Sequence, residues 1–460
     1  MIVPEFLNNL LQRLRGERGN NMQLLCRELL SHRGEASQTV LAQHIIEQYR
    51  QMGSEQQLKF FQLLANDFGT DKQVIQKAIE NYGRGATPVN EAALAAATEP
   101  PRQELFRRIN TGPSGTETLV RMRRDLQRLL PGHSDLTAVD SDLKHLFRSW
   151  FNRGFLRMER INWQTPAITL EKLIDYESVH EINGWPDLHR RLAADRRCFA
   201  FFHPSLPGEP VIFIEVALTK GLARAIDPLL DVNAPVLAAD EADTAIFYSI
   251  NNCLEGLRGI PFGNFLIKQV VDELRAELPR GRVYSTLSPL PGFAKAVNAS
   301  DNPDGFTRER LGRLLKEFAG ELATEAALSD PADAIFELLK DPFSHQKVLT
   351  APLRRMAVAY LTQMKRNGRP VDPVANFHFS NGARLEAVDP FANARGYGIR
   401  ESFGMMVNYR YVPDDLADNH ERFIETGDTP VSASLLTERR VSGELWHGPR
   451  KKQAGEKAAG

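Results

Sequence analysis

The chain has 460 residues, of which 42% are hydrophobic and 25% are charged. This length exceeds what one hydrophobic core usually serves, so it predicts two domains. Lysine and arginine together number 57, aspartate and glutamate together 58, and the net charge is -1. Such a balance excludes binding to nucleic acid or to a membrane surface through bulk charge, and no apolar run is long enough to cross a bilayer.

Three widely spaced cysteines, Cys26, Cys198 and Cys253, form neither a disulfide framework nor a zinc site. They indicate a reducing compartment and no bound metal. The first five residues lack the charged and then apolar layout of a secretory signal, and the last three are not a peroxisomal signal. We therefore expect a cytoplasmic protein.

The first third of the chain is predicted to be helical. Apolar residues recur at helical spacing over 40–52, and two capping-box patterns, at 54–57 and 70–73, each precede an apolar stripe. Amphipathic stretches follow at 116–130 and 143–151. We predict a helical bundle over 1–150 that serves support or assembly.

The pattern changes after about residue 150. Short apolar runs predict strands, and longer periodic stretches predict helices between them. The predicted strands or extended segments are 198–202, 211–218, 245–250, 282–287, 374–378 and 405–411, and the predicted helices are 264–278, 307–318 and 348–365. This mixture predicts an α+β or mixed α/β domain over 151–447, followed by a disordered polar tail over 448–460.

A glycine-bearing loop, 256–263, connects the predicted strand 245–250 to the helix that follows. Glycines allow the backbone to turn tightly and approach a ligand, and the N-terminus of a helix favours a phosphate. Arg258 and Lys268 add positive charge. The loop is neither a P-loop nor a dinucleotide fingerprint, and from its spacing alone a plain surface loop is the more common interpretation.

Two further segments carry polar side chains beside predicted strand ends. Ser288 follows the strand 282–287, where open sheets tend to place ligands, and Pro289 and Pro291 stiffen the exit from it. His378 lies between Phe377 and Phe379 in the segment 374–378, which is predicted to be extended. A serine before a proline is usually a turn residue, and a lone histidine is more often structural than catalytic.

Taken together and in this order, these segments closely resemble those of the malonyl-CoA decarboxylase family. The resemblance covers most of residues 150–412 and is weaker in the helical first third. Its most specific pieces are Leu-Ser-Pro-Leu-Pro-Gly-Phe at 287–293 and Asn-Phe-His at 376–378, and the segment 406–411 supports it.

The resemblance implies a helical N-terminal domain followed by a catalytic domain with a GNAT-type acyltransferase fold. It places the catalytic serine at Ser288, the catalytic histidine at His378, and further site positions at Ser249 and Tyr411. The CoA loop falls on Arg258, Gly259, Ile260, Pro261, Phe262, Gly263 and Asn264. Pro261 stands where a general GNAT loop has a glycine and where some relatives have a carboxylate, which leaves open whether a carboxylate orients His378.

The implied reaction converts malonyl-CoA to acetyl-CoA and CO2 through a thioester enolate that the serine–histidine pair protonates at C2. No metal and no cofactor are expected, because CoA is part of the substrate. We also expect a homo-oligomer, a dimer or a tetramer, formed through the helical domain.

Three other functions are alternatives to this one. A GNAT-type acyltransferase that acylates an amine shares the fold and the loop. A serine hydrolase is disfavoured because no G-x-S-x-G elbow surrounds Ser288. A helical adaptor without enzymatic activity is disfavoured by the second domain with its polar segments.

Overall fold

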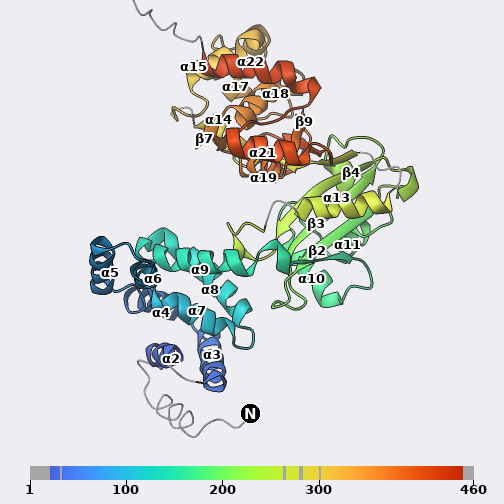
Figure 1. Cartoon of the computed structure of the whole chain (residues 1–460). Coiled ribbons are helices and arrows are strands. Elements are labelled where there is room, and N and C mark those ends of the chain that lie inside the picture. The colour runs from blue at the N-terminus through green and yellow to red at the C-terminus, as the bar shows by residue number, and fades with distance from the viewer. Residues whose placement is uncertain (1–20, 32–33, 263–265, 279–282, 300–301, 449–460) are drawn as a thin grey trace, which may run out of the picture.

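The computed structural model describes residues 21–31, 34–262, 266–278, 283–299 and 302–448. From residue 449 on, the predicted polar tail lies outside these ranges. The first part of the chain is helical, as predicted, and lies at the lower left of Figure 1. Its helices are α2 (Asn21–Leu30), α3 (Glu35–Arg50), α4 (Ser54–Asn66), α5 (Lys72–Arg84), α6 (Pro88–Thr98), α7 (Pro101–Asn110), α8 (Gly115–Leu129) and α9 (Thr137–Trp150).

The two predicted helix starts are each displaced by one residue. Gly53 rather than Ser54 is the N-cap of α4, and its N–H donates to the Gln56 side chain over 3.1 Å. Asp71 rather than Thr70 is the N-cap of α5, and it accepts a hydrogen bond from the Gln73 N–H over 2.8 Å. In α5 the side chain of the cap accepts from the free N–H groups of the first turn, whereas in α4 the Gln56 side chain accepts from the N–H of the cap. A neighbouring serine or threonine therefore does not decide where either helix begins.

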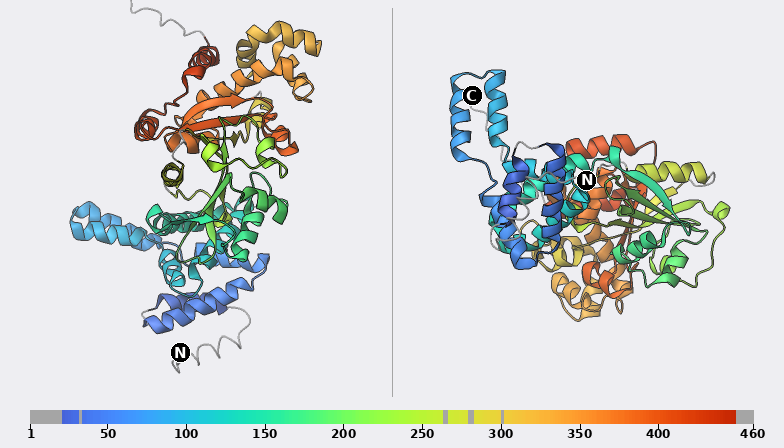
Figure 2. Two further views of the ribbon diagram at one scale, coloured as in Figure 1. Left: turned by 90° about the vertical axis from the view of Figure 1, so that its right-hand side faces the viewer. Right: turned by 90° about the horizontal axis from the view of Figure 1, so that it is seen from below.

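Helices α5 and α6 form a hairpin that projects from the other N-terminal helices (Figure 2). Ala78 is the one buried residue of α5, and α6 has none among its described residues. The hairpin is therefore held mainly by contacts between its own two helices.

The second part of the chain forms an eight-stranded mixed sheet, shown in green at the right of Figure 1 and continuing upward to β9. Its strands are β1 (Arg157–Ile161), β2 (Arg196–Phe202), β3 (Pro210–Thr219), β4 (Thr244–Asn252), β5 (Val283–Thr286), β6 (Ser288–Pro289), β9 (Arg384–Asp389) and β10 (Met406–Tyr411). β1 to β4 are antiparallel neighbours, β4 and β5 are parallel, and β10 pairs antiparallel with β5, β6 and β9. Strands β1, β6 and β9 were not predicted.

The predicted unit of strand, loop, helix and strand is confirmed. Strand β4 leads through the turn η5 (Glu255–Leu257) to α13 (Leu266–Glu277) and on to β5, and Phe247 lies opposite Thr286 in the parallel pair. A helical crossover is the usual way to join parallel neighbours. This unit within an otherwise antiparallel sheet is the GNAT-type arrangement that the resemblance implies.

Helices cover both faces of the sheet. Val270 and Leu274 of α13 pack in the same buried cluster as Val216 of β3. On the opposite face, α10 (Ala167–Tyr176) and α11 (Trp185–Arg191) pack against β2 and β3, which places Leu170 and Leu188 in one cluster with Phe213. Both faces of the central strands are therefore dry.

The remaining helices form a group above the sheet in Figure 1, together with the short hairpin β7 (Lys365–Arg366) and β8 (Arg369–Pro370). These helices are α14 (Phe293–Asn298), α15 (Arg308–Leu315), α16 (Ala319–Ala326), α17 (Pro331–Leu338), α18 (Gln346–Thr362), α19 (Pro373–Ser380), α20 (Gly396–Ser402), α21 (Leu416–Thr426) and α22 (Leu436–His447). The short α12 (Asp227–Leu230) follows β3. Among the described helices, none combines the length and apolar character that a membrane span requires.

Candidate active site

Ser288 is held by sheet pairing. It begins β6, directly after β5 and Leu287, and Val407 of β10 lies opposite it in an antiparallel pair. Only 6% of Ser288 is exposed, and its Oγ donates to Thr286 Oγ1 over 2.9 Å. The residue thus lies just past the end of β5, as predicted, with both its backbone and its hydroxyl fixed.

His378 lies on a helix, so the predicted extended segment at 374–378 is wrong. The segment belongs to α19, whose N-cap Asp372 accepts a hydrogen bond from the Ala375 N–H over 2.8 Å. Pro373 occupies the first turn, where its fixed backbone angle and missing N–H are favourable. A short apolar run fits a strand or a helix equally well, and the Asp-Pro start signal decides for the helix.

The structure brings Ser288, His378 and Tyr411 together. Nε2 of His378 lies 3.2 Å from Ser288 Oγ, and Nδ1 lies 2.7 Å from the Tyr411 hydroxyl. The imidazole also stacks on the Tyr409 ring, with centroids 4.5 Å apart. Ser288 comes from β6, His378 from α19, and both tyrosines from β10. Both nitrogens of the buried imidazole therefore have a hydroxyl partner.

The imidazole is neutral at pH 7, because burial lowers the pKa of His378 to about 3. A neutral ring donates from one nitrogen and accepts at the other. With Tyr411 donating to Nδ1, Nε2–H donates to Ser288 Oγ, and the serine hydroxyl donates to Thr286 Oγ1. Burial also raises the pKa of Tyr411 well above its usual value, which keeps the phenol protonated.

No carboxylate among the described residues hydrogen bonds to His378; the Tyr411 hydroxyl takes that place. The carboxyl group of Asp372 acts on the position of His378 only indirectly, through the helix. Asp372 caps α19 and is fully buried, and its Oδ2 lies 3.2 Å from the Tyr360 hydroxyl. The same hydroxyl lies 3.2 Å from the carbonyl oxygen of Pro291. Asp372 and Tyr360 thus connect the helix of His378 to the segment that follows Ser288.

Proton count favours a neutral Asp372. A phenol has one proton and cannot fully serve two acceptors. Burial raises the pKa of Asp372 to about 7, and a protonated Asp372 donates to Tyr360, which then donates to Pro291. Every polar group in this connection is satisfied in that state.

The predicted CoA loop lies at the same edge of the sheet as Ser288, because the loop follows β4 and Ser288 follows β5, and these strands are parallel. Arg258, Gly259 and Pro261 are exposed, whereas Ile260 and Phe262 are buried. Gly259 has a φ of +76°, which favours glycine. Gly263 and Asn264 lie outside the described residues.

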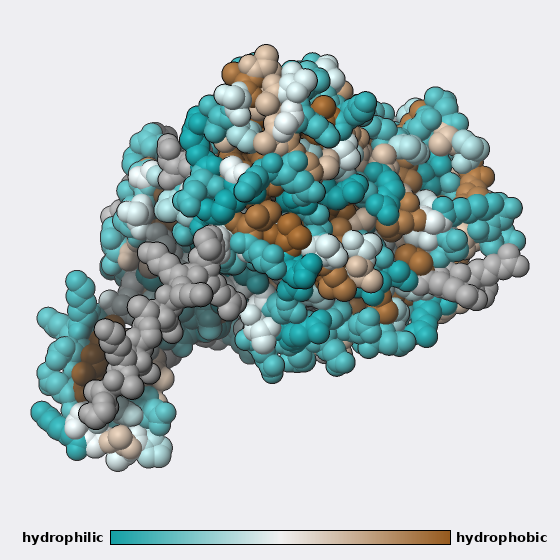
Figure 3. Space-filling model, turned by 90° about the horizontal axis from the view of Figure 1, so that it is seen from above, coloured by the Kyte–Doolittle hydropathy of each residue, from teal (hydrophilic) through white to brown (hydrophobic). Residues whose placement is uncertain are grey.

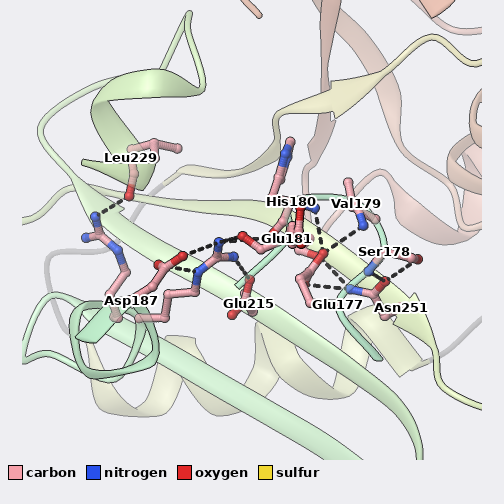
Figure 4. A network of polar contacts seen from close by, with 12 residues as sticks. Glu177, Ser178, Val179, His180, Glu181, Asp187, Glu215, Leu229 and Asn251 are labelled. Carbon is pink, nitrogen blue, oxygen red and sulfur yellow. Dashed lines mark hydrogen bonds and ion pairs between the residues drawn. The ribbon is translucent and has the colours of Figure 1, made fainter. Parts of the chain in front are cut away.

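Ser249 occupies a separate polar cluster on the face covered by α10 and α11. Its hydroxyl donates to Glu177 Oε2 over 2.7 Å and accepts from Asn251 Nδ2 over 2.6 Å. Figure 4 shows the surrounding network, in which the other oxygen of Glu177 accepts from the N–H groups of Val179 and His180. The described hydrogen bonds of Ser249 therefore support β4 and do not reach Ser288 or His378.

Comparison with known proteins gives consistent matches. Family models match the chain with the malonyl-CoA decarboxylase N-terminal domain at residues 68–151 and the malonyl-CoA decarboxylase C-terminal domain at 154–447. The mitochondrial malonyl-CoA decarboxylase of Anser anser anser is 35% identical over 401 residues, which cover 81% of this chain and 78% of that protein. The crystal structure of malonyl-CoA decarboxylase from Rhodopseudomonas palustris is 43% identical, with a TM-score of 0.81, and covers 92% of this chain and 100% of its own. The structure from Agrobacterium vitis is 42% identical, with a TM-score of 0.81, and covers 91% and 99%.

The chain belongs to the malonyl-CoA decarboxylase family. Membership in this family makes it a decarboxylase, with EC 4.1.1.9 as the expected class. The helical domain and the GNAT-type domain are the fold expected of a malonyl-CoA decarboxylase from the sequence resemblance.

Several residues around the candidate site of this malonyl-CoA decarboxylase family member were not predicted. Thr286, Tyr360, Asp372 and Tyr409 contact or position the predicted pair, and Glu177 holds Ser249. Asp372 had a usable signal, since Asp-Pro is a helix start. The others lie on apolar stretches or far along the chain, where spacing gives no sign of a shared site.

The neutral state of Asp372 predicts a specific dependence of stability on pH. Its pKa rises from 3.8 to about 7 on folding, so its stabilising contribution is complete below pH 4 and is lost as pH rises to 7. Asp372→Asn keeps a neutral cap, and its melting temperature should match or exceed that of the parent at pH 7. Asp372→Ala loses the cap and should be less stable by about 1 kcal/mol or more at both ends of the range.

The matched control is Asp330→Asn, which alters the exposed N-cap of α17 and should leave the pH dependence unchanged. Thermal unfolding of all four proteins at pH 4, 5.5 and 7 provides the measurement. A loss of stability at pH 7 that is as large for the asparagine as for the alanine variant would show that Asp372 is ionised there.

Proposed function

We propose that this chain converts malonyl-CoA to acetyl-CoA and CO2 at Ser288 and His378. The single observation that carries the proposal is the contact of 3.2 Å between Ser288 Oγ and His378 Nε2 at the edge where the β4–α13 loop also lies. The names of the family and of its similar members support the substrate. The proposed roles of the residues follow from the two halves of the reaction.

The substrate supplies its own electron sink. When the bond between C2 and the carboxylate breaks, CO2 leaves and the electron pair moves into the thioester carbonyl, which becomes an enolate. The protein must hold that bond perpendicular to the thioester plane and stabilise the new negative charge on oxygen. The N–H groups of Gly259 and Phe262 in the loop 258–262 are candidates for this task, and a well-placed donor is worth roughly 3–4 kcal/mol. The N–H groups of Arg258 and Ile260 already donate within the turn, and Pro261 has none.

The second half of the reaction is protonation of C2. The neutral chain Tyr411, His378, Ser288 can deliver a proton without a charged imidazole: Ser288 gives its hydroxyl proton to C2, Nε2–H passes to Ser288 Oγ, and the Tyr411 proton passes to Nδ1. Tyr411 then regains a proton from solvent. One proton is consumed for each CO2 released, and the C2 carbanion is quenched.

A GNAT-type acyltransferase is the alternative function, because it shares the fold and the loop. It would need an amine acceptor and would release free CoA. The Ser288–His378 contact favours decarboxylation, since aminolysis needs no proton donor at C2.

The direct test is to mix the purified protein with malonyl-CoA alone and follow acetyl-CoA and CO2. We expect equal amounts of the two products and no requirement for an amine. We also propose that no metal or organic cofactor takes part, so a chelator should leave the rate within about 2-fold of the untreated rate, well short of the change that loss of a catalytic metal causes. Release of free CoA only on addition of an amine would favour the acyltransferase instead.

The roles of Ser288 and His378 are tested by substitution. Ser288→Ala and His378→Ala should each lower kcat by about 10²–10⁴-fold, the usual size of a positioned proton transfer, while CoA still binds. Ser402→Ala changes another buried serine, which hydrogen bonds to backbone carbonyls of α20 and Met405, and should keep kcat. Near-parental turnover by both site variants would refute the assignment.

We also propose a homo-oligomer, a dimer or a tetramer, formed through the helical domain. The projecting hairpin of α5 and α6 supports this, because 49% of Ile79 and 76% of Val89 are exposed there. On the face seen in Figure 3, hydrophobic residues form patches separated by hydrophilic ones. A second copy of the chain would cover the apolar side chains of the hairpin.

Charged residues on the hairpin should therefore weaken assembly. The double variant Ile79→Glu and Val89→Glu is expected to raise the subunit dissociation constant by at least about 10-fold, because two apolar side chains lose their buried contacts. Light scattering over a dilution series measures this. Val236→Glu, at a position that is 54% exposed outside the hairpin, is the control, and an equal loss of mass in both variants would argue against the hairpin.

A cytoplasmic location stays a prediction, since similar relatives are named as mitochondrial.

A further inference from the structure

The N-terminal helices hold the loop that follows β4. Arg123 of α8 is buried, and its Nη1 donates to the carbonyl oxygens of Gly256 over 2.7 Å and Arg258 over 3.0 Å. Its Nε donates to Asp140 over 2.8 Å. These bonds occupy the guanidinium inside the protein, so Arg123 fixes the backbone of the loop and does not face a ligand.

The contact leaves no space between the loop and α8. A Cβ on Gly256 would lie 1.9 Å from the carbonyl oxygen of Val120. At the surface, Arg128 and Glu255 form an ion pair of 2.8 Å across the same contact. The loop therefore packs against the helical domain in a single position. Groups that the helices place near residues 258–260 are held at a defined position relative to the loop.

Lys144 of α9 is such a group. Its Nζ lies 3.7 Å from the position that a Cβ on Gly259 would occupy. The side chain is half-buried, and no hydrogen bond or ion pair joins it to another described residue. Arg258, the preceding residue of the loop, is exposed and likewise has no ion pair within the described ranges.

Lys144 and Arg258 differ from the neighbouring arginines in their partners. Arg123 in the same region is matched by Asp140, and Arg128 by Glu255, whereas Lys144 and Arg258 have no such counter-charge in the part of the chain that the structure describes. Gly259 between them has no side chain, which lets a ligand approach the backbone closely. A phosphate satisfies an ammonium group through charge-assisted hydrogen bonds, and lysine is a common phosphate ligand.

We infer that Lys144 binds a phosphate of the CoA nucleotide, so that the N-terminal helical domain supplies part of the acyl-CoA site. The inference rests on the proposed function, which places acyl-CoA at this loop. It adds that the ligand bridges the two domains, with Arg258 on the catalytic side and Lys144 on the helical side. Lys144 would then act in binding, with no part in the chemistry at C2.

The experiment compares Lys144→Gln with the parent protein. We expect the dissociation constant of CoA, measured by titration calorimetry, to rise by about 10-fold, the size expected for one charge-assisted hydrogen bond. KM for malonyl-CoA should rise by a similar factor while kcat stays within about 2-fold, because an equal loss of ground-state and transition-state binding appears in KM. With malonyl-pantetheine, which lacks the nucleotide phosphates, the variant and the parent should have equal KM.

Two controls sharpen the result. Lys144→Arg keeps the charge and should recover most of the CoA affinity, and Lys77→Gln removes an exposed lysine of α5 and should change nothing. An unchanged CoA dissociation constant in Lys144→Gln would overturn the inference, and so would an equal rise in KM for malonyl-pantetheine. CoA binding is measured without turnover, so the two claims are tested by different measurements. Absence of decarboxylation would refute the proposed function, whereas the CoA dissociation constant alone decides the role of Lys144.

Discussion

The pairing of β10 with β5 and β6 is the contact on which the candidate site depends. Thr286 takes part in this pairing through both its side chain and its backbone. Its hydroxyl accepts from the Tyr409 N–H over 3.1 Å, and its backbone carbonyl accepts from Asn408 Nδ2 over 2.6 Å. Tyr409 and Tyr411 are two positions apart on β10, so both point to the same face of the sheet. The imidazole of His378 lies against these two rings, and a shift of β10 by one residue would remove both contacts.

Burial away from solvent sets the protonation states of Ser288, His378 and Tyr411. Hydroxyls partner both nitrogens of His378, and no ion pair joins it to another residue within the described ranges, so the ring is held neutral. In the proposed mechanism a neutral relay suits the reaction, because neutral CO2 leaves while the negative charge of the carboxylate moves to the thioester oxygen, and a buried fixed cation would have to be desolvated before substrate arrives. The separate cluster around Glu177 shows the opposite design, with a carboxylate that accepts four hydrogen bonds.

Sequence patterns predicted the longer helices and strands better than the short segments and the contacts between elements. The alternation of helical and strand patterns located α8, α13, β3, β4 and β10, because burial on one face imposes a period that short windows can detect. The segment of His378 was misassigned because eight residues are too few to show a helical period. The tertiary contacts of the site were out of reach: Thr286 meets Tyr409 across 123 positions, and no local pattern encodes that meeting.

The pairing of Ser288 with His378 came from family resemblance rather than from spacing. Neither residue is distinctive alone, as a serine before proline and a histidine between phenylalanines have common structural uses. Ser249 was grouped with them by the same resemblance, yet its hydrogen bonds lie on the other side of the sheet. Resemblance does not give contacts, and the contacts place Ser249 in a different hydrogen-bonded cluster from Ser288 and His378.

The fit of Gly256 against Val120 also bears on how this protein can change over generations. With 1.9 Å between a would-be Cβ and a main-chain oxygen of another domain, position 256 cannot drift to any other residue unless α8 moves as well. A substitution at position 256 would then need a matching change in the backbone of α8. Exchange of the helical part with that of a distant homologue would be selected against wherever the two backbones no longer match.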